Sequence, residues 1–314
     1  MRRLLRRLPQ PLLDRMRAGR KRYRSVRYRT RERLRPVRLG REEIETALRA
    51  AGAGEGDAVF VQAGMAAFGT IEGGPGTVIE ALEAVVGPEG LIAMPAFPLN
   101  RPAVEHLRAG AVFDARSTPS QMGAISEAFR TAPGVLRSVH PTHSVCARGP
   151  GAAEVVAGHE LAATPFGQGT PFERLIDRGA LQVYFGSGVR AITMYHAWEC
   201  LREPPYPIKV FLPQPIDARC VDAEGRELTV STLVHDPRVM PGRIDSDPRL
   251  EVQIRARLIA GGMRSVSLGR GEVLAQPIPQ MLETFERMLG EGLTIYRPEL
   301  LRQAEAGAGA GGPA

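Results

Sequence analysis

The sequence predicts an α/β fold, in which a central mixed sheet is flanked by helices and an antiparallel β addition lies in the C-terminal half. Three short apolar runs, at 57–62, 91–97 and 180–186, have the length and composition of buried strands. Segments with helical periodicity alternate with these runs, as is typical of an α/β domain. From 208 to 234 the pattern changes to alternating strands. One main domain with additions accounts for all of these observations.

The first elements are expected in the order helix, strand, glycine-rich loop, helix and strand. Residues 41–52 (REEIETALRAAG) have an amphipathic pattern that ends at glycines. The strand 57–62 is followed by the loop GTIEGGPG at 69–76 and by a helix for which Thr77 is the expected cap. The strand 91–97 (LIAMPAF) comes next.

The C-terminal half is expected to contain two hairpins and the remaining helices. The turn DAEG at 222–225 joins two of the alternating strands, and SVSLGRGEVLAQ at 265–276 has the pattern of a second hairpin. Helices are expected at 126–132, after the strand 180–186, and at 280–292.

The net charge of +7 hides an uneven distribution. Residues 1–41 contain 17 Lys or Arg and two acids, which leaves 24 basic and 32 acidic residues in 42–314, a net charge of −8. We therefore expect a basic leader at 1–40, one main domain at 41–300, and a disordered tail of small residues at 301–314. An acidic body suits cationic small molecules and argues against nucleic acid as a partner.

The leader is compatible with a solvated tail or with weak contact to anionic lipid. No apolar run reaches the roughly 18 residues that span a membrane. Three scattered cysteines argue against a disulfide framework and favour a reducing, cytoplasmic location. A small-molecule substrate is the expected partner, and a homodimer is left open.

One candidate site lies in AITMYHAWE at 191–199. Thr193, His196 and Glu199 are spaced so that they fall near one face of a helix. The helix follows a strand and a GSG turn, and ligands usually bind at that edge of an α/β sheet. A histidine oriented by a carboxylate can act as a general base near neutral pH. Spacing alone does not distinguish this role from that of a histidine paired with a surface glutamate.

Other motifs are less specific. The glycine-rich loop could place backbone N–H groups against a phosphate, or it could be a plain tight turn. In SVHPTHS at 138–144, His140 and His143 are too few for a zinc site, and the cysteines add no ligands at a suitable spacing, so no metal is expected. A hydrogen-bonded loop that lines a pocket fits this motif better. No nucleophile motif is present, which favours direct transfer over a covalent enzyme intermediate.

Four ordered blocks resemble the aminoglycoside 3-N-acetyltransferase family, whose members are distinct from the smaller GNAT acetyltransferases. The blocks are AFGTIEGGPGTVIEALEAVVGPEGLIAMPAF, FDARSTPSQMGAISEAFRTAPGVLRSVHPTHSV, GHELAATPFGQGTPFERL and GALQVYFGSGVRAITMYHAWE. The resemblance extends from about residue 41 to 290, and four blocks in this order are a strong family signal.

This resemblance implies acyl transfer from acetyl-CoA, without a metal, to the amine of an aminoglycoside or amino sugar. It assigns His196 as the catalytic base, Glu199 as its supporting carboxylate and Thr193 as a candidate stabiliser of the oxyanion. The residues it implies in acetyl-CoA binding are Ala67, Phe68, Gly69, Gly73, Gly74, Gly76, Thr77, Gly169 and Thr170. Those it implies in the substrate pocket are His140, Ser144 and Asp114.

The chain departs from the family pattern after its first strand. The family typically has a VHxSL-like sequence there, whereas this chain has VQAGM, with Gln62 in place of a histidine and Gly64 in place of a hydroxyl residue. Two alternatives therefore remain. The protein could be a non-catalytic CoA- or ligand-binding relative, or a biosynthetic acyltransferase that acts on a nucleotide- or lipid-linked amino sugar.

Overall fold

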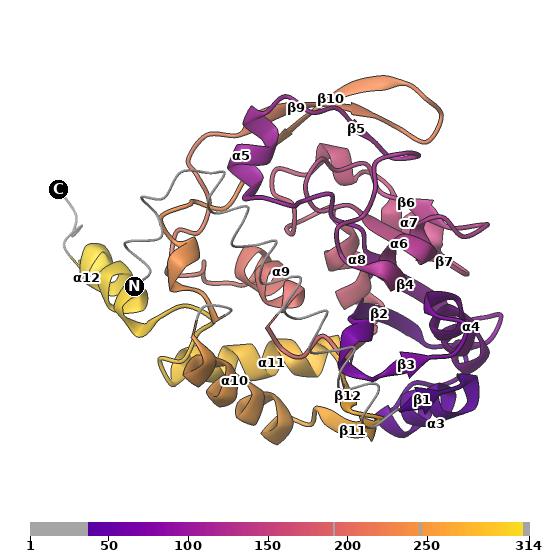
Figure 1. Cartoon of the computed structure of the whole chain (residues 1–314). Coiled ribbons are helices and arrows are strands. Elements are labelled where there is room, and N and C mark those ends of the chain that lie inside the picture. Colours follow the sequence, from indigo (N-terminus) through magenta and orange to yellow (C-terminus); the bar gives the residue numbers. More distant parts are fainter. Residues whose placement is uncertain (1–36, 191, 245–246, 310–314) are drawn as a thin grey trace, which may run out of the picture.

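The centre of the protein is a seven-stranded mixed sheet with the strand order β11-β12-β8-β2-β4-β7-β6 (Figure 1). The computed structural model describes residues 37–190, 192–244 and 247–309. Strand β2 (Ala58–Ala63) runs parallel to β4 and β8, and the other pairs in this sheet are antiparallel. The remaining strands are β4 (Leu91–Pro95), β6 (Leu136–Arg137), β7 (Val145–Arg148), β8 (Leu181–Phe185), β11 (Arg264–Leu268) and β12 (Gly271–Pro277).

Alternation along the strands builds two apolar layers, one on each face of the sheet. In β2, Val59 and Val61 face one layer whereas Phe60 faces the other, because successive side chains of a strand point to opposite faces. The first layer is covered by α3 (Arg41–Ala51), α4 (Pro75–Val86) and α6 (Ala124–Arg130). The second is covered by α8 (Pro171–Asp177), α9 (Thr193–Leu201), α10 (Pro248–Ala260) and α11 (Ile278–Gly290). The predicted α/β class, with a mixed sheet between helices, is confirmed.

A second, three-stranded sheet lies beside the main one. Strands β9 (Ile216–Val221) and β10 (Glu227–Thr232) form the antiparallel hairpin that the DAEG turn predicts. Strand β5 (Phe113–Asp114) joins β9 in parallel, although it comes from the first half of the chain. Short elements complete the description: α5 (Ala103–Arg108), α7 (Ala152–Val156), β1 (Arg38–Leu39), β3 (Thr70–Ile71), and the 3-10 turns Met65–Ala67, His159–Leu161 and Met240–Gly242.

Two local expectations differ from the structure. Thr77 does not cap α4, which begins at Pro75 after Gly74. Proline is well suited to the first helical position because its fixed φ fits the helix and its missing N–H would be unpaired there anyway. Gly74 precedes it with a φ of 70°, a conformation that favours glycine.

The tail is the second difference. Helix α12 (Pro298–Gly309) extends into the segment 301–314 for which we expected disorder, and Leu301 is buried. The apolar contact of Leu301 helps to hold the helix against the body, so composition alone misjudged residues 301–309. The basic leader at 1–36 lies outside the described residues. Within the described part of the chain, no helix has the length and apolarity needed to cross a membrane.

Candidate active site

The candidate site lies where the parallel strands β2 and β8 end. Strand β8 ends at Phe185, Gly186 turns the chain with a φ of 67°, and α9 begins at Thr193. A side chain at Gly186 would collide with the ring of Phe68 and with the carbonyl of Gly64. The close approach of these backbone segments therefore needs glycine and places the start of α9 at the strand ends.

His196 and Glu199 form a buried hydrogen-bonded pair. The distance from His196 Nδ1 to Glu199 Oε2 is 2.6 Å, and the two side chains are 5% and 1% exposed. The hydroxyl of Tyr296 donates a second hydrogen bond to Glu199 Oε2, at 3.3 Å. With Nδ1 engaged, His196 Nε2 is the nitrogen available to a substrate. It is buried and has no hydrogen-bond partner among the described residues.

Burial shifts both members of the pair toward their uncharged forms. It lowers the pKa of His196 well below its usual value, and the nearby positive charge of Arg243 lowers it further. Burial raises the pKa of Glu199 to about 8, against the opposing effects of the Tyr296 hydrogen bond and of Arg243. The pair therefore holds a proton at neutral pH that an exposed carboxylate would have lost.

A second histidine, His235, lies beside His196 and was not predicted from the sequence. The ring centroids are 4.5 Å apart, and His235 Nε2 is also buried without a hydrogen-bond partner among the described residues. The ring of His235 stacks on Phe211 at 4.8 Å. His235 belongs to an irregular segment after β10, so neither periodicity nor a motif marks it.

Five of the six histidines belong to one connected group of rings that includes Phe166; four of them are buried and His235 is partly buried. The ring of Phe166 lies within 6 Å of His143, His196 and His235. His140 stacks on His159 at 4.4 Å. Burial lowers the pKa of each of these five histidines.

His140 is engaged within the protein rather than open to a ligand. Its Nδ1 accepts hydrogen bonds from the backbone N–H groups of Thr142 and His143, and its Nε2 lies 3.2 Å from Thr232 Oγ1 on β10. These contacts hold the loop 140–143 (HPTH) against strand β10 of the second sheet. The hydrogen-bonded loop expected at 138–144 is present.

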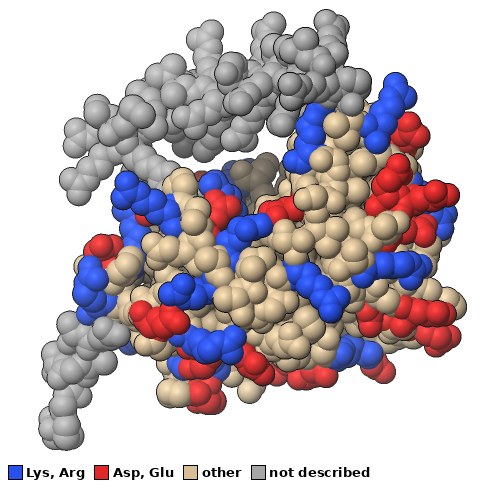
Figure 2. All heavy atoms as spheres, turned by 90° about the horizontal axis from the view of Figure 1, so that it is seen from below, with Lys and Arg blue, Asp and Glu red and all other residues tan. Residues whose placement is uncertain are grey.

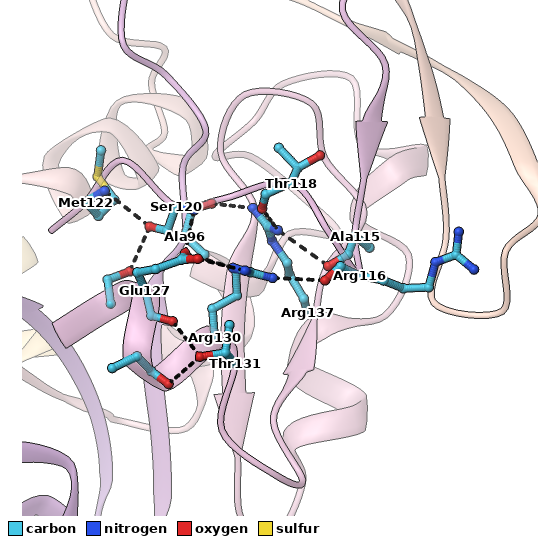
Figure 3. A network of polar contacts seen from close by, with 12 residues as sticks. Ala96, Ala115, Arg116, Thr118, Ser120, Met122, Glu127, Arg130, Thr131 and Arg137 are labelled. Carbon is cyan, nitrogen blue, oxygen red and sulfur yellow. Dashed lines mark hydrogen bonds and ion pairs between the residues drawn. The ribbon is translucent and has the colours of Figure 1, made fainter. Parts of the chain in front are cut away.

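Ser144 is held by a hydrogen bond from the buried Arg137, whose guanidinium lies in the polar network shown in Figure 3. Its hydroxyl accepts from Arg137 Nε at 3.1 Å and donates to the carbonyl of Ala96 at 2.9 Å. The guanidinium also donates to the carbonyls of Ala96 and Thr118, at 2.7 and 2.5 Å. Asp114 is bound elsewhere, in an ion pair with Arg116 that lowers the pKa of the carboxyl.

The predicted acetyl-CoA segments have clear local roles. Phe68 is buried and packs on Phe185 at a centroid distance of 4.2 Å. Thr170 caps α8 and donates to the carbonyl of Gly167. Gly69, Gly73, Gly74 and Gly169 have positive φ angles, and a Cβ added at Gly74, Gly76 or Gly169 would meet no atom within 4 Å. The loop before α4 is thus open to an approaching ligand.

The unusual VQAGM segment makes contacts of its own. The Gln62 side chain donates to Thr193 Oγ1 at 3.0 Å, and its backbone carbonyl accepts from Ser187 at 2.9 Å. A Cβ at Gly64 would lie 3.3 Å from the carbonyl oxygen of Gly186. Gln62 therefore links the end of β2 to the first residue of α9, and Gly64 allows the two strand ends to approach.

A cavity of about 820 Å³ reaches the pair from one side. Its wall includes Glu199, Gly167, Tyr206 and Phe211. Because Phe211 stacks on His235, which in turn lies against His196, a row of rings connects the cavity wall to the histidine of the pair. Among the described residues, the wall includes none of His140, Ser144 and Asp114, which were expected in the substrate pocket.

The site also contains donor atoms that a metal could use. One atom each of His196, Glu199 and His235 lies within 4.8 Å of the others. Two histidines and a carboxylate suit zinc. The positive charge of Arg243 acts on all three residues and opposes the binding of a further cation among them.

Comparisons with known proteins identify the family to which the chain belongs. Residues 60–290 match the family model for aminoglycoside 3-N-acetyltransferase. Aminoglycoside N(3)-acetyltransferase VIII of Streptomyces fradiae is 31% identical over 259 residues, which are 77% of this chain and 86% of the relative. Aminoglycoside N(3)-acetyltransferase III of Salmonella sp. is 32% identical over 178 residues, or 52% of this chain, and the match spans 62% of that relative, less than two thirds of its length.

Solved structures give the same result. The crystal structure of aminoglycoside acetyltransferase AAC(3)-Xa is 26% identical with a TM-score of 0.71, covering 86% of this chain and 99% of that one. AAC-IIIb, solved with CoASH, shares the fold with a TM-score of 0.68 at 24% identity, over 82% of this chain and 98% of that one. The match of most of the chain to the family model, together with these relatives, shows that the chain belongs to the aminoglycoside 3-N-acetyltransferase family.

Proposed function

We propose that this protein transfers an acetyl group from acetyl-CoA directly to an amine of an aminoglycoside or amino sugar, with His196 as the general base. The observation that carries the proposal is the buried His196–Glu199 pair, in which Nδ1 is engaged at 2.6 Å and Nε2 has no partner among the described residues. A base must present one such nitrogen to the proton that it removes.

The donor supplies an activated thioester, and family membership supports acetyl-CoA in this role. The solved AAC-IIIb complex with CoASH is consistent with it. In this chain Gly74 and Gly76 have open space beside them at the start of α4, and a helix N-terminus favours phosphate. Gly167 lies on the wall of the cavity, and Gly169 follows it in the same loop. We assign these two loops to the phosphates and the pantetheine arm.

The residues of the chain divide the proton-transfer work as follows. His196 Nε2 accepts the proton of the amine as its nitrogen attacks the thioester carbonyl. Glu199 holds the Nδ1–H and thereby orients the ring and favours the positive charge that develops on it. Thr193 Oγ1 accepts from Gln62, which leaves its own hydroxyl proton to donate to the developing oxyanion.

Thiol release from acetyl-CoA tests the proposal, with His196→Ala compared with the unchanged protein across aminoglycosides and amino sugars. The variant should lose about 10²- to 10⁴-fold in turnover, the usual contribution of a general base. His106→Ala is the matched control, because His106 is the histidine outside the buried group and should be dispensable. Near-normal turnover of His196→Ala would contradict the role of His196. Binding of acetyl-CoA without thiol release from any acceptor would instead support a non-catalytic relative.

A further inference from the structure

The two oxygens of the Glu199 carboxylate have different surroundings. Oε2 lies 2.6 Å from His196 Nδ1 and accepts a hydrogen bond from the hydroxyl of Tyr296 at 3.3 Å. Oε1 is buried and has no hydrogen-bond partner among the described residues. On the face shown in Figure 2, acidic side chains are exposed and lie among basic ones, whereas the side chain of Glu199 is 1% exposed. The orientation of this carboxylate therefore depends on the contacts that Oε2 makes.

Tyr296 is held in place by the chain around it. It lies between α11 and α12 and is 1% exposed. Thr294 Oγ1 accepts a hydrogen bond from the backbone N–H of Tyr296 at 3.1 Å and donates to its carbonyl at 3.0 Å. The backbone N–H of Ile244 donates to the carbonyl of Ile295 at 2.7 Å, and Tyr296 forms an antiparallel bridge with Arg243. These contacts fix the phenol ring next to Glu199.

The hydrogen bond from Tyr296 comes from a part of the chain that the family match does not cover. The family model matches residues 60–290, and α11 ends at Gly290. Tyr296 follows in the short segment before α12, which begins at Pro298. The match therefore assigns no role to the residue that donates the second hydrogen bond to Glu199.

We infer that Tyr296 is a positioning residue of the reaction, whose hydroxyl keeps Glu199 Oε2 on His196 Nδ1 and so presents His196 Nε2 to the amine of the acceptor. The inference rests on the proposed function, because it concerns the same base. The last torsion of a glutamate side chain is broad, and no hydrogen bond on Oε1 among the described residues opposes its rotation. The hydroxyl also stabilises the charged form of the carboxylate, since hydrogen bonds to ionised groups are strong.

Other groups around Glu199 also influence its protonation. Besides His196 and Tyr296, the charged or titratable groups that face it are His235, Arg243, Tyr195, Tyr206 and Cys200. Burial raises the pKa of Glu199 to about 8, and the hydrogen bond from Tyr296 opposes this shift more than Arg243 does. Loss of the Tyr296 hydroxyl alone should therefore raise the pKa of Glu199 further.

Tyr296→Phe tests the contact, because it removes the hydroxyl and keeps the ring. The experiment measures kcat/KM for thiol release between pH 6.5 and 9.5, with neamine as the acceptor for both proteins, so that the titration of the acceptor cancels in their ratio. The variant should be about 10-fold slower at pH 7, the effect of one hydrogen bond to a charged group, and nearly as fast as the unchanged protein at pH 9.5. KM for acetyl-CoA should not change.

Tyr184→Phe is the matched control. Tyr184 is a buried tyrosine of the same apolar layer, and its hydroxyl contacts Met281 Sδ at 4.0 Å. This variant should have the pH dependence of the unchanged protein. A merely structural role of Tyr296 predicts the same fold loss at every pH. That result, or unchanged kinetics in a folded Tyr296→Phe variant, would overturn the inference.

Nuclear magnetic resonance of the histidine ring nitrogens tests the same contact without turnover. The signals of His196 are those that disappear in His196→Ala. Their titration should move to higher pH in Tyr296→Phe and stay in place in Tyr184→Phe. If neamine and the other acceptors release no thiol, the proposed function fails, but this titration still decides about the contact: a shift supports it and no shift refutes it.

A second replacement covers the case in which Tyr296→Phe does not fold. With 3-fluorotyrosine at position 296, the hydroxyl is retained and is a stronger hydrogen-bond donor than that of tyrosine. The titration of His196 should then move to lower pH, and an unchanged titration would refute the role of Tyr296.

Discussion

The rings of His196 and His235 lie 4.5 Å apart, although the two residues come from different parts of the fold. His196 belongs to α9 and is held by Glu199, whereas His235 follows β10 and stacks on Phe211 at the cavity wall. Both Nε2 atoms are buried and lack hydrogen-bond partners among the described residues. Under the proposed function, two imidazoles whose pKa values are lowered by burial thus meet where the amine of the acceptor loses its proton.

His235 is expected to position the acceptor beside His196. In His235→Phe the ring contact with Phe211 is retained but both nitrogens are lost. We expect kcat/KM to fall by about 10-fold, the effect of one lost hydrogen bond to a polar or charged group. Steady-state thiol release measures this, with circular dichroism to verify folding. Unchanged kinetics in a folded variant would remove His235 from the site.

Activity is expected to rise with pH as the His196–Glu199 pair loses its proton. Burial raises the pKa of Glu199 to about 8. Below that pH, the carboxyl proton occupies the hydrogen bond to Nδ1 and leaves the ring N–H on Nε2, which then cannot accept a proton. Deprotonation moves this N–H to Nδ1 and frees Nε2. We therefore expect kcat/KM to increase up to about tenfold per pH unit below 8 and to level off above it.

Glu199→Gln separates this effect from the titration of the acceptor, because its amide oxygen can still accept from Nδ1–H but carries no titrating proton. In the variant, the rise of kcat/KM with pH near 8 should disappear, and the maximum rate should fall. Acceptors with different amine pKa values provide the second comparison. If the rise of kcat/KM with pH follows the pKa of the acceptor amine and persists in Glu199→Gln, it does not come from the His196–Glu199 pair.

Acid is expected to destabilise the fold through the buried histidines. Burial lowers the folded-state pKa of all five, and that of His159 falls to about 3. Below the unfolded value of about 6.5, the unfolded chain binds protons that the folded chain does not, so stability is lost as the pH falls. Each histidine contributes at most about 1.4 kcal/mol per pH unit to this loss.

Urea unfolding at pH 7.5, 6.5 and 5.5 measures this dependence. His143→Phe should flatten it, because the ring of His143 packs between those of Phe97 and Phe166, a setting that accepts another aromatic ring. His106→Gln should change it little, since the lone histidine outside the group is only half-buried. An unfolding free energy that does not fall between pH 6.5 and 5.5 would contradict the prediction.

Removal of metal ions is expected to leave the reaction unchanged. Although His196, Glu199 and His235 offer donor atoms within 4.8 Å, the mechanism needs His196 Nε2 free, and Arg243 opposes a further positive charge. Prolonged incubation with a chelator should therefore not lower thiol release, whereas added Zn²⁺ should inhibit by occupying the histidines. If the chelator abolishes activity and added Zn²⁺ restores it, His196, Glu199 and His235 form a metal centre.

The sequence predicted the elements with strong periodicity, and it predicted the pair. The strands at 57–62, 91–97 and 180–186 and both hairpins are confirmed, because alternation and turn residues are local signals. The three cysteines are free thiols, in agreement with the expected absence of disulfides. His196 and Glu199 share one helical turn, so their contact follows from spacing once α9 is assigned.

Contacts between distant segments could not be predicted in this way. The hydrogen bond from Gln62 to Thr193 joins strand β2 to helix α9, and no sequence pattern marks such a contact. From the sequence, glutamine in place of the family histidine suggested a lost functional group, whereas in the structure its side chain makes this hydrogen bond. His235 reaches the site from an irregular segment that has no pattern of its own. Thr77 was misassigned as a cap because its residue type fits that role, whereas the proline two positions earlier already starts the helix.

The pairing of β5 with β9 has a consequence for how the protein folds. This contact joins Phe113 to Cys220 and so encloses the whole intervening segment, including β8 and α9, in a closed loop of chain. Closing so long a loop carries an entropic cost that only later contacts repay, and it slows folding. The two histidines lie on opposite sides of that closure, one within the loop and one beyond it, so their contact joins the enclosed segment to the segment that follows it.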